Sequence, residues 1–210
     1  MHLALTVRDL VVLSWAVSPA AVGRDLPAEL VPALDPEGRA IVSLVALRAT
    51  DVRVSDRRAP GFRQLNLRTY VERAGTTEIL LLSVRASLFG VPAALFGVPV
   101  RPARLHVREG RVSAPGLGVS FGYERRGPAG HVPAIGGAAI GSQPSLLAFS
   151  AGVRRIDAPH DPFAWEDAAL TAPPRVEPVL ALGFDVAEPH SALYAARTAF
   201  HVELPPKALE

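Results

Sequence analysis

The sequence predicts a mainly β protein (α+β), with a curved or closed antiparallel sheet resembling a barrel and a few short helices. Three observations favour this fold class. Strand signals dominate over helical ones, several segments are rich in Val, Leu and Ile, and turn residues separate neighbouring segments. With 210 residues, 49% of them hydrophobic, the chain can bury a substantial core. We therefore expect a single domain spanning residues 1–210.

The first elements are two apolar strands with a helix between them. Val11–Val17 and Ala40–Val54 are rich in β-branched and apolar residues, and the second is long enough to bend or to contain a bulge. The intervening segment Ser18–Glu29 is expected to be helical, because Ser18 is a plausible N-cap and Pro19 suits the first turn.

Two hairpins are expected in the middle of the chain. Leu65–Arg73 and Glu78–Ala86 flank Ala74-Gly75-Thr76-Thr77, which is typical of a hairpin turn. Arg104–Arg108 and Arg111–Ala114 flank a Glu-Gly pair in the same manner. Both patterns predict antiparallel neighbours.

The remaining elements are shorter. Ser87–Phe96 is expected to form a short helix, and Gly127–Ser145, rich in Gly, Pro and Ala, is expected to be a loop. Further strand or apolar segments follow at Gly118–Glu124, Leu146–Phe149, Val179–Phe184 and Ala199–Leu204.

Polar side chains repeat at every second position within Gln64–Val71. Strand geometry places Gln64, Asn66, Arg68 and Tyr70 on one face and Leu65, Leu67, Thr69 and Val71 on the other. The polar face is either solvated or lines a polar cavity. On the next strand, alternation places Ser83 and Arg85 on one face and Leu80, Leu82 and Val84 on the other.

Composition excludes several kinds of chemistry. The net charge is only +2 and the basic pairs are scattered, so we expect no nucleic-acid partner. Lys207 is the one lysine, so no internal Schiff base can form, and the absence of cysteine excludes disulfides and thiolate catalysis. The histidines lack metal-ligand spacing, and we expect no metal and no cofactor. Apart from His2 near the N-terminus, they are His106, His131, His160, His190 and His201.

Neither apolar run is typical of a targeting or membrane segment. Leu10–Val17 has no clear cleavage site after it, and Ala86–Val100 is interrupted by Gly and Pro and is too short to span a bilayer. We expect a cytoplasmic protein with no membrane partner. Long strands with exposed edges make a homodimer plausible.

Several short segments follow one another in a recognisable order: Trp15-Ala16-Val17 with Leu26-Pro27, Gly38–Val42, Asn66–Val71, Phe96–Pro99, His160–Trp165 and Pro189–Tyr194. Together they resemble the YqjF-like proteins, an uncharacterised bacterial family of the acetoacetate-decarboxylase-like superfamily. Asn66–Val71 is the most specific of them. The resemblance implies an acetoacetate-decarboxylase-like β-barrel fold that encloses a small cavity.

The chain departs from the family pattern at three places. Gln64 stands where the pattern has Glu, and a carboxamide cannot exchange protons as a carboxylate can. Val100 and Arg101 stand where members that decarboxylate acetoacetate carry two lysines, one of which forms the Schiff base. Residues 150–155 lack the acidic-basic-aromatic run of the family. Acetoacetate decarboxylation by the family mechanism is therefore not expected.

The residues that remain are suited to holding an anion. Arg68 can bind a carboxylate in bidentate fashion or act as an internal strut, with Asn66, Tyr70 and Gln64 as hydrogen-bonding walls. Arg101 is either an anion ligand or a surface residue. The preferred hypothesis is a non-enzymatic protein that binds a small organic acid. The alternative is a lysine-independent enzyme acting on a small carboxylic or keto acid, with Tyr70 or a histidine such as His190 moving protons.

Overall fold

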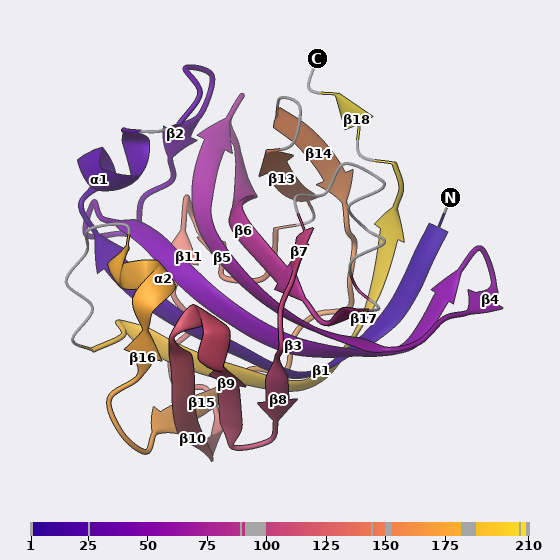
Figure 1. Cartoon of the computed structure of the whole chain (residues 1–210). Coiled ribbons are helices and arrows are strands. Elements are labelled where there is room, and N and C mark those ends of the chain that lie inside the picture. The colour runs from indigo at the N-terminus through magenta and orange to yellow at the C-terminus, as the bar shows by residue number, and fades with distance from the viewer. Residues whose placement is uncertain are drawn as a thin grey trace.

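The computed structural model describes residues 2–24, 26–88, 90, 100–143, 145–149, 153–181, 188–205 and 207–208, and its central feature is a strongly curled sheet (Figure 1). Five long strands form the middle of this sheet, in the spatial order β6-β5-β3-β1-β17. They are β1 (His2–Val17), β3 (Ala40–Val54), β5 (Phe62–Arg73), β6 (Thr76–Ala86) and β17 (Ser191–Glu203). All four pairings among them are antiparallel.

Shorter strands extend both edges, so that the full path runs β18-β14-β13-β6-β5-β3-β1-β17-β15-β10-β9-β8. Their bounds are β7 (Val100–Pro102), β8 (His106–Arg108), β9 (Arg111–Ala114), β10 (Val119–Pro128), β13 (Ser145–Phe149), β14 (Val153–Asp157), β15 (Glu166–Leu170) and β18 (Lys207–Ala208). The smallest pieces are β2 (Val31–Pro32), β4 (Arg57–Arg58), β11 (Ala134–Ile135), β12 (Ala138–Ala139), β16 (Arg175–Val176), α1 (Pro19–Gly23), α2 (Glu177–Leu180) and a 3-10 turn at Pro115–Leu117.

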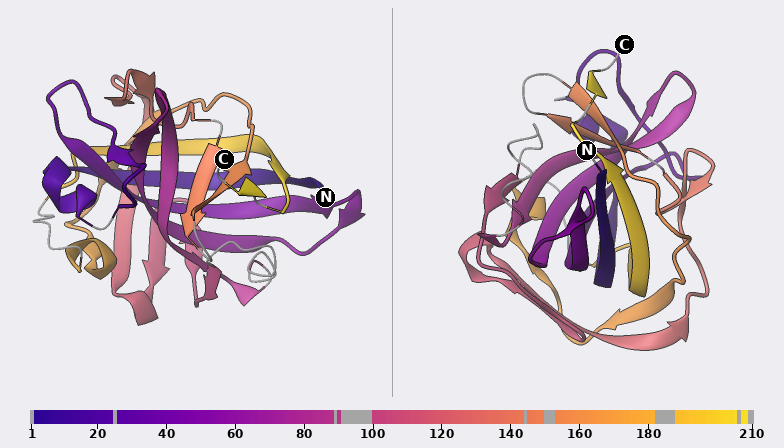
Figure 2. Two further views of the ribbon diagram at one scale, coloured as in Figure 1. Left: turned by 90° about the horizontal axis from the view of Figure 1, so that it is seen from above. Right: turned by 90° about the vertical axis from the view of Figure 1, so that its right-hand side faces the viewer.

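The sheet curls into a half barrel, as the two views of Figure 2 show. This confirms the predicted mainly β, barrel-like class with few helices. The sheet is not wholly antiparallel, because β6 pairs in parallel with both β7 and β13. No helix in the described part of the chain is long and apolar enough to cross a membrane.

The long strands bury both of their faces. Leu13, Leu44 and Leu67 lie on one face, in a core cluster that also holds the apolar residues of β8, β9 and β10. On the other face Val12 and Val45 belong to a second cluster, which surrounds the cavity described below. Burial on both sides explains why these strands read as continuous apolar runs rather than as alternating ones.

The long strands β1 and β3 each contain a bulge at an aspartate, and each bulge changes the direction of its strand. Asp9 (φ 52°) and Asp51 (φ 51°) adopt the left-handed conformation, and the β1–β3 register shifts at each of them. Asp9 is held by Arg48, whose Nη2 lies 2.8 Å from its Oδ2, and by the hydroxyl of Tyr194 at 3.4 Å. Burial raises the pKa of Tyr194 to about 12, so the phenol stays protonated and donates to Asp9. The expected bulge in the second strand is therefore present, at Asp51.

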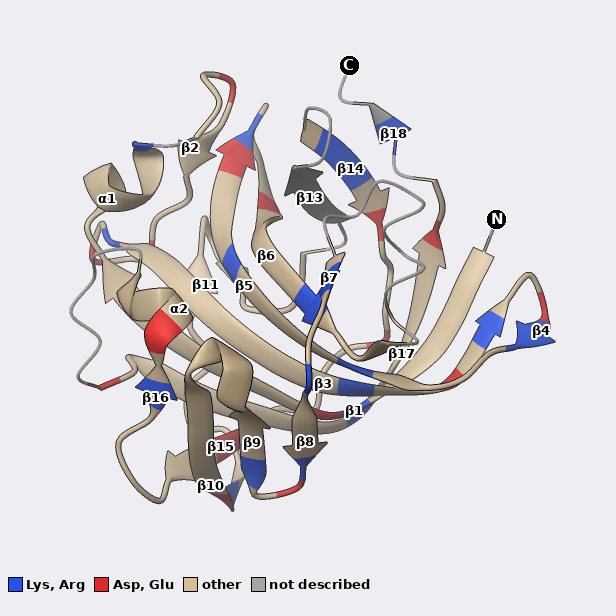
Figure 3. Cartoon of the chain, in the orientation of Figure 1, with Lys and Arg blue, Asp and Glu red and all other residues tan. Residues whose placement is uncertain are grey.

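Four arginines lie directly opposite one another on neighbouring strands, and we call them the arginine row. Arg197 of β17 pairs in register with Arg8 of β1, Arg8 with Arg48 of β3, and Arg48 with Arg63 of β5. Figure 3 shows blue bands next to each other on β1 and β3. Because Arg63 precedes Gln64, the row lies on the face of the sheet away from the cavity.

Both predicted hairpins are confirmed. β5 and β6 are joined by Ala74 (φ 47°) and Gly75 (φ 76°), a two-residue turn with two positive φ angles, and β8 and β9 meet across Glu109-Gly110. The strand expected at Ala199–Leu204 is the end of the longer β17.

Three expectations are wrong. The helix expected over Ser18–Glu29 ends at Gly23, because Pro27 cannot continue it. The loop expected over Gly127–Ser145 contains the β11–β12 hairpin, whose Gly-Gly turn supplies two positive φ angles. Val179 and Leu180 lie in α2, not in a strand, and residues 182–184 fall outside the described ones. Most of the helix expected at Ser87–Phe96 also lies outside them.

Candidate functional site

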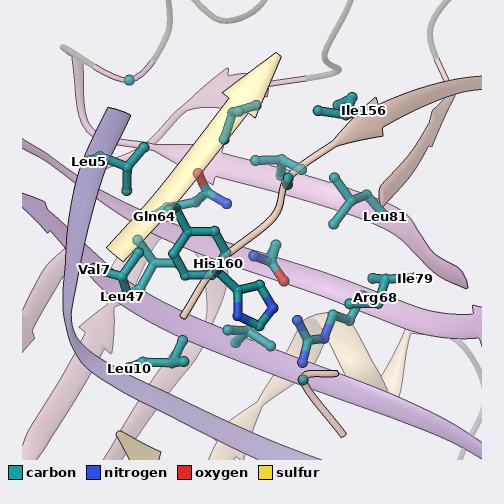
Figure 4. A pocket seen from close by; sticks show the side chains of 18 of the residues that line it. Leu5, Val7, Leu10, Leu47, Gln64, Arg68, Ile79, Leu81, Ile156 and His160 are labelled. Atoms are coloured by element: carbon teal, nitrogen blue, oxygen red, sulfur yellow. The ribbon is translucent and has the colours of Figure 1, made fainter. Parts of the chain in front are cut away.

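A cavity of about 170 Å³ lies against the face of the long sheet that carries Val12 and Val45 (Figure 4). Side chains from β1, β3, β5, β6 and β17 form one side of it. The segment from Ala158 to Trp165, between β14 and β15, forms another. The lining is mostly aliphatic and aromatic, with a few polar groups, which is the usual composition of a small-molecule site.

The polar face of β5 turns toward this cavity. Gln64, Asn66 and Arg68 line it, and Asn66 is only 5% exposed. The residues between them, Leu65 and Leu67, point into the opposite core. The alternation predicted from the sequence is therefore confirmed for these residues, and Gln64, Asn66 and Arg68 face a cavity and not bulk water.

Arg68 carries the one charge among the described residues that line the cavity, apart from the titratable His160. Its Nε is buried and has no hydrogen-bond partner in the described part of the chain. Its guanidinium lies over the ring of Tyr70, 5.5 Å from the ring centroid. This cation–π contact positions the guanidinium but uses none of its hydrogen-bond donors.

Asn66 shares this unpaired state. Its Oδ1 is buried and has no partner among the described residues. Buried polar groups in folded proteins are nearly always hydrogen-bonded, so an unpaired amide oxygen beside an unpaired guanidinium indicates a place for polar atoms of a ligand.

His160 faces the same cavity from the opposite wall. Its Nδ1 lies 2.8 Å from the backbone oxygen of Asp161. A carbonyl only accepts, so Nδ1 donates, and in the neutral ring Nε2 remains an acceptor. The ring lies 4.6 Å from that of Phe163 and 4.7 Å from that of Phe200, which fixes its plane.

Gln143 also lines the cavity, but its side chain is used internally. Its Oε1 accepts from the backbone N–H of Gly141, and its Nε2 donates to the oxygen of Ala139. Gly141 itself has φ 86°, and a Cβ there would lie 2.8 Å from the rings of Phe163 and Trp165. Glycine is therefore required where the chain passes behind the aromatic wall.

Two of the residues predicted as ligand contacts lie outside the cavity lining. Tyr70 is fully buried in the neighbouring core, where it supports Arg68. Arg101 is exposed on β7 and lies in register with Arg85 of β6, which does not line the cavity either. Val100, by contrast, lines the cavity. Ligand contact by Arg101 and Tyr70 remains a prediction that this geometry does not favour.

The facing predicted for β6 is wrong at one point. The β5–β6 register shifts between Leu67 and Arg68, so that β6 carries an extra residue there. Beyond this bulge Leu81 and Ile79 join Val84 in lining the cavity, whereas strict alternation placed Leu80 and Leu82 with Val84.

Lys207 lies on β18 and is not among the described residues that line the cavity. Its Nζ lies 2.6 Å from Oδ2 of Asp157 and 3.4 Å from Oε2 of Glu203. The hydrogen bond to Asp157 raises the pKa of Lys207, which keeps the amine protonated and unsuited to Schiff-base formation. Among the described residues no group of three His, Asp or Glu side chains is placed to hold a metal ion.

Sequence reasoning missed His160 and the aromatic wall of Phe163, Trp165 and Phe200. The signal was present, because His160–Trp165 is one of the segments that resemble the YqjF-like family. Nothing in the sequence indicated that this segment faces β5, since contact between them depends on how the sheet curls. His190, the histidine considered for proton transfer, is exposed and lies away from the cavity.

Comparisons with solved structures identify the fold. An acetoacetate decarboxylase-like enzyme from Sphingomonas wittichii RW1 matches with a TM-score of 0.64 and 13% identity, over 100% of this chain and 92% of the other. Acetoacetate decarboxylase from Legionella pneumophila matches with a TM-score of 0.61 and 12% identity, over 100% and 88%. The enduracididine biosynthesis enzyme MppR, complexed with pyruvate, matches with a TM-score of 0.59 and 14% identity, over 97% and 88%.

No curated protein matches the chain. A family model does match, that of DUF2071, described as an uncharacterized conserved protein, over residues 4–199. The match covers nearly the whole length of the chain and agrees with the family resemblance seen in the sequence. The chain therefore belongs to the DUF2071 family, and it has the fold of the acetoacetate decarboxylase-like proteins.

Proposed function

We propose that this protein binds a small organic acid in the cavity, and that it does so without Schiff-base chemistry. The observation that carries the proposal is Arg68. Its guanidinium lies in a largely apolar cavity, and no carboxylate of the described lining residues neutralises it. Leaving a charge partly buried and unpaired is costly, and a carboxylate ligand would offset that cost with two charge-assisted hydrogen bonds.

The similar fold of MppR, which has been solved with pyruvate, is consistent with a small carboxylate in such a cavity. The amine that an iminium intermediate requires is absent. Lys207 is held by Asp157 on the outside of the molecule, and Val100 lines the cavity where the resemblance places the first lysine of the pair.

Calorimetric titration with a panel of monocarboxylic acids and their neutral amides tests this proposal. We expect the wild type and Arg85→Met to bind the acids and Arg68→Met to lose binding by at least tenfold. Arg85→Met is the matched control, because Arg85 belongs to the same hairpin, has no ion pair within the described residues and does not line the cavity. Equal binding of acids and amides, or equal binding by Arg68→Met, would contradict the proposal.

His160 supports a second candidate function, a lysine-independent enzyme that moves a proton. Its Nε2 is an acceptor in a cavity that also holds Arg68. With a 2-keto acid on Arg68, Nε2 would take a proton from the carbon beside the carbonyl, giving an enolate and an imidazolium, and would then return a solvent proton. Proton NMR in D₂O tests this candidate. Enzyme-dependent deuterium incorporation that His160→Gln abolishes would support it, and exchange no faster than the background rate would exclude it.

A further inference from the structure

We infer that the ligand is a 2-hydroxy monocarboxylate with a bulky apolar body, either an aromatic ring or a branched chain. This inference rests on the proposed function and specifies it. Three properties of the cavity each specify one part of the ligand. The charge of the lining specifies the single carboxylate, the apolar lining and the cavity volume specify the bulky body, and the unpaired acceptor of Asn66 specifies the hydroxyl.

The charge of the lining limits the ligand to one carboxylate. Arg68 is the one permanent cation that faces the cavity among the described residues. A second carboxylate would have no permanent cation to pair with, because the rest of the described lining consists of aliphatic and aromatic side chains and a few neutral polar groups such as Gln64. Burying an unpaired carboxylate there is strongly unfavourable, so dicarboxylates are excluded by desolvation and not by size.

The apolar part of the cavity is suited to a ring or a branched chain. Phe163 and Trp165 stack with their centroids 4.5 Å apart, and Phe200 lies 5.9 Å from Phe163, so these rings form a continuous wall. Leu47, Val84 and the other aliphatic residues face it. An apolar cavity of about 150 Å³ holds a benzene molecule, and this one measures about 170 Å³. Acetate or pyruvate would leave most of it unfilled.

The unpaired oxygen of Asn66 accounts for the hydroxyl. Asn66 and Arg68 are two residues apart on one strand face, so their Cα atoms lie roughly 6.6 Å apart. A carboxylate held by Arg68 leaves Oδ1 of Asn66 without a donor. A hydroxyl on the carbon next to the carboxylate would supply that donor, and the Nε2 acceptor of His160 faces the same cavity.

Four ligands separate these three parts of the inference: mandelate, phenylacetate, acetate and phenylmalonate. Calorimetric titration of the wild type should give the affinity order mandelate, phenylacetate, acetate, with phenylmalonate weaker than phenylacetate. We expect mandelate to bind about fivefold tighter than phenylacetate through one additional hydrogen bond. Phenylacetate should bind at least tenfold tighter than acetate through burial of the ring. Both enantiomers of mandelate are measured, and the tighter one is used.

The variant Asn66→Leu tests the hydroxyl separately, because leucine is close in size and has no polar atom. The preference for mandelate over phenylacetate should disappear in this variant, while phenylacetate still binds. If Asn66→Leu does not fold, the fivefold ratio in the wild type still decides the point. Acetate or phenylmalonate binding as tightly as phenylacetate, or mandelate no tighter than phenylacetate, would overturn the inference and leave organic-acid binding intact. Failure of all four ligands would count against the proposed function itself.

Discussion

Replacing Arg68 by methionine distinguishes a binding arginine from a structural strut, because the two roles predict opposite changes in the stability of the free protein. The substitution removes the contact with the ring of Tyr70, which is worth about 0.5–1 kcal/mol. It also removes a partly buried charge whose Nε has no partner among the described residues, and desolvating such a group costs about 1–3 kcal/mol. The balance makes Arg68→Met more stable by about 1 kcal/mol.

Thermal unfolding without ligand measures this difference. For a chain of 210 residues, about 1 kcal/mol corresponds to an increase in Tm of roughly 2–4 °C. Arg85→Met, which removes an arginine from the same hairpin outside the cavity, should change Tm by less than about 1–2 °C. A decrease of several degrees in Arg68→Met would refute the reasoning, because it would show that Arg68 stabilises the fold.

The same pair of proteins should reverse order when a ligand is added. At a concentration of 100 times Kd, a bound acid stabilises the wild type by about 2.7 kcal/mol. Arg68→Met should gain little, so the wild type becomes the more stable protein. Such a reversal would show that the charge of Arg68 contributes to ligand binding and not to the stability of the fold.

Three further substitutions test how the rest of the fold is held. Glu78→Gln should lower the free energy of unfolding, measured in urea, by about 2–4 kcal/mol. The reason is that the Glu78 carboxylate is 1% exposed and pairs with Arg73 and Arg155. A loss below about 0.5 kcal/mol would mean that these ion pairs are solvated. Ala74→Asn should raise Tm by roughly 1–4 °C, because Asn tolerates the φ of 47° in the β5–β6 turn better than Ala; an unchanged Tm would exclude strain there. Burial would raise the pKa of Asp35, but hydrogen bonds from the loop that follows, chiefly those of Arg39, hold it below its ordinary value. The carboxylate therefore stabilises the fold above about pH 4, and this contribution is lost as the pH falls through the lowered pKa. Asp35→Asn should be less stable than the wild type by about 1–2 kcal/mol at pH 7, with the gap closing toward pH 3 in urea titrations, and a gap independent of pH would contradict the assignment.

Local sequence patterns predicted the strands and hairpins well. Alternation along Gln64–Val71 placed its two faces correctly, because a slip of one residue in register would turn the polar side chains into the apolar core and the leucines toward the cavity. The Gly75 and Gly110 turns were found because their backbone conformations favour glycine. These features depend on neighbours in the sequence.

The structural features that the sequence did not predict depend on contacts between segments that are distant along the chain. The bulge on β6 leaves no pattern in its apolar run, so Leu80 and Leu82 were wrongly placed on the face of Val84. His160 reaches the cavity because the segment between β14 and β15, far along the chain from β5, supplies part of the cavity lining. The curl itself arises from strand twist and from bulges such as those at Asp9 and Asp51, and composition does not encode its extent.

The arginine row makes the free energy of this fold depend on dissolved salt. Neighbouring strands lie about 4.8 Å apart, so the four cations repel one another at close range. Within the described residues the ion pair between Arg48 and Asp9 partly offsets this repulsion. The Debye length falls from about 30 Å at 0.01 M salt to about 10 Å at 0.1 M. Added electrolyte therefore weakens the mutual repulsion and strengthens the pairing of the long strands. We therefore expect dissolved salt to raise the free energy of unfolding of this sheet, whose other face forms the cavity wall.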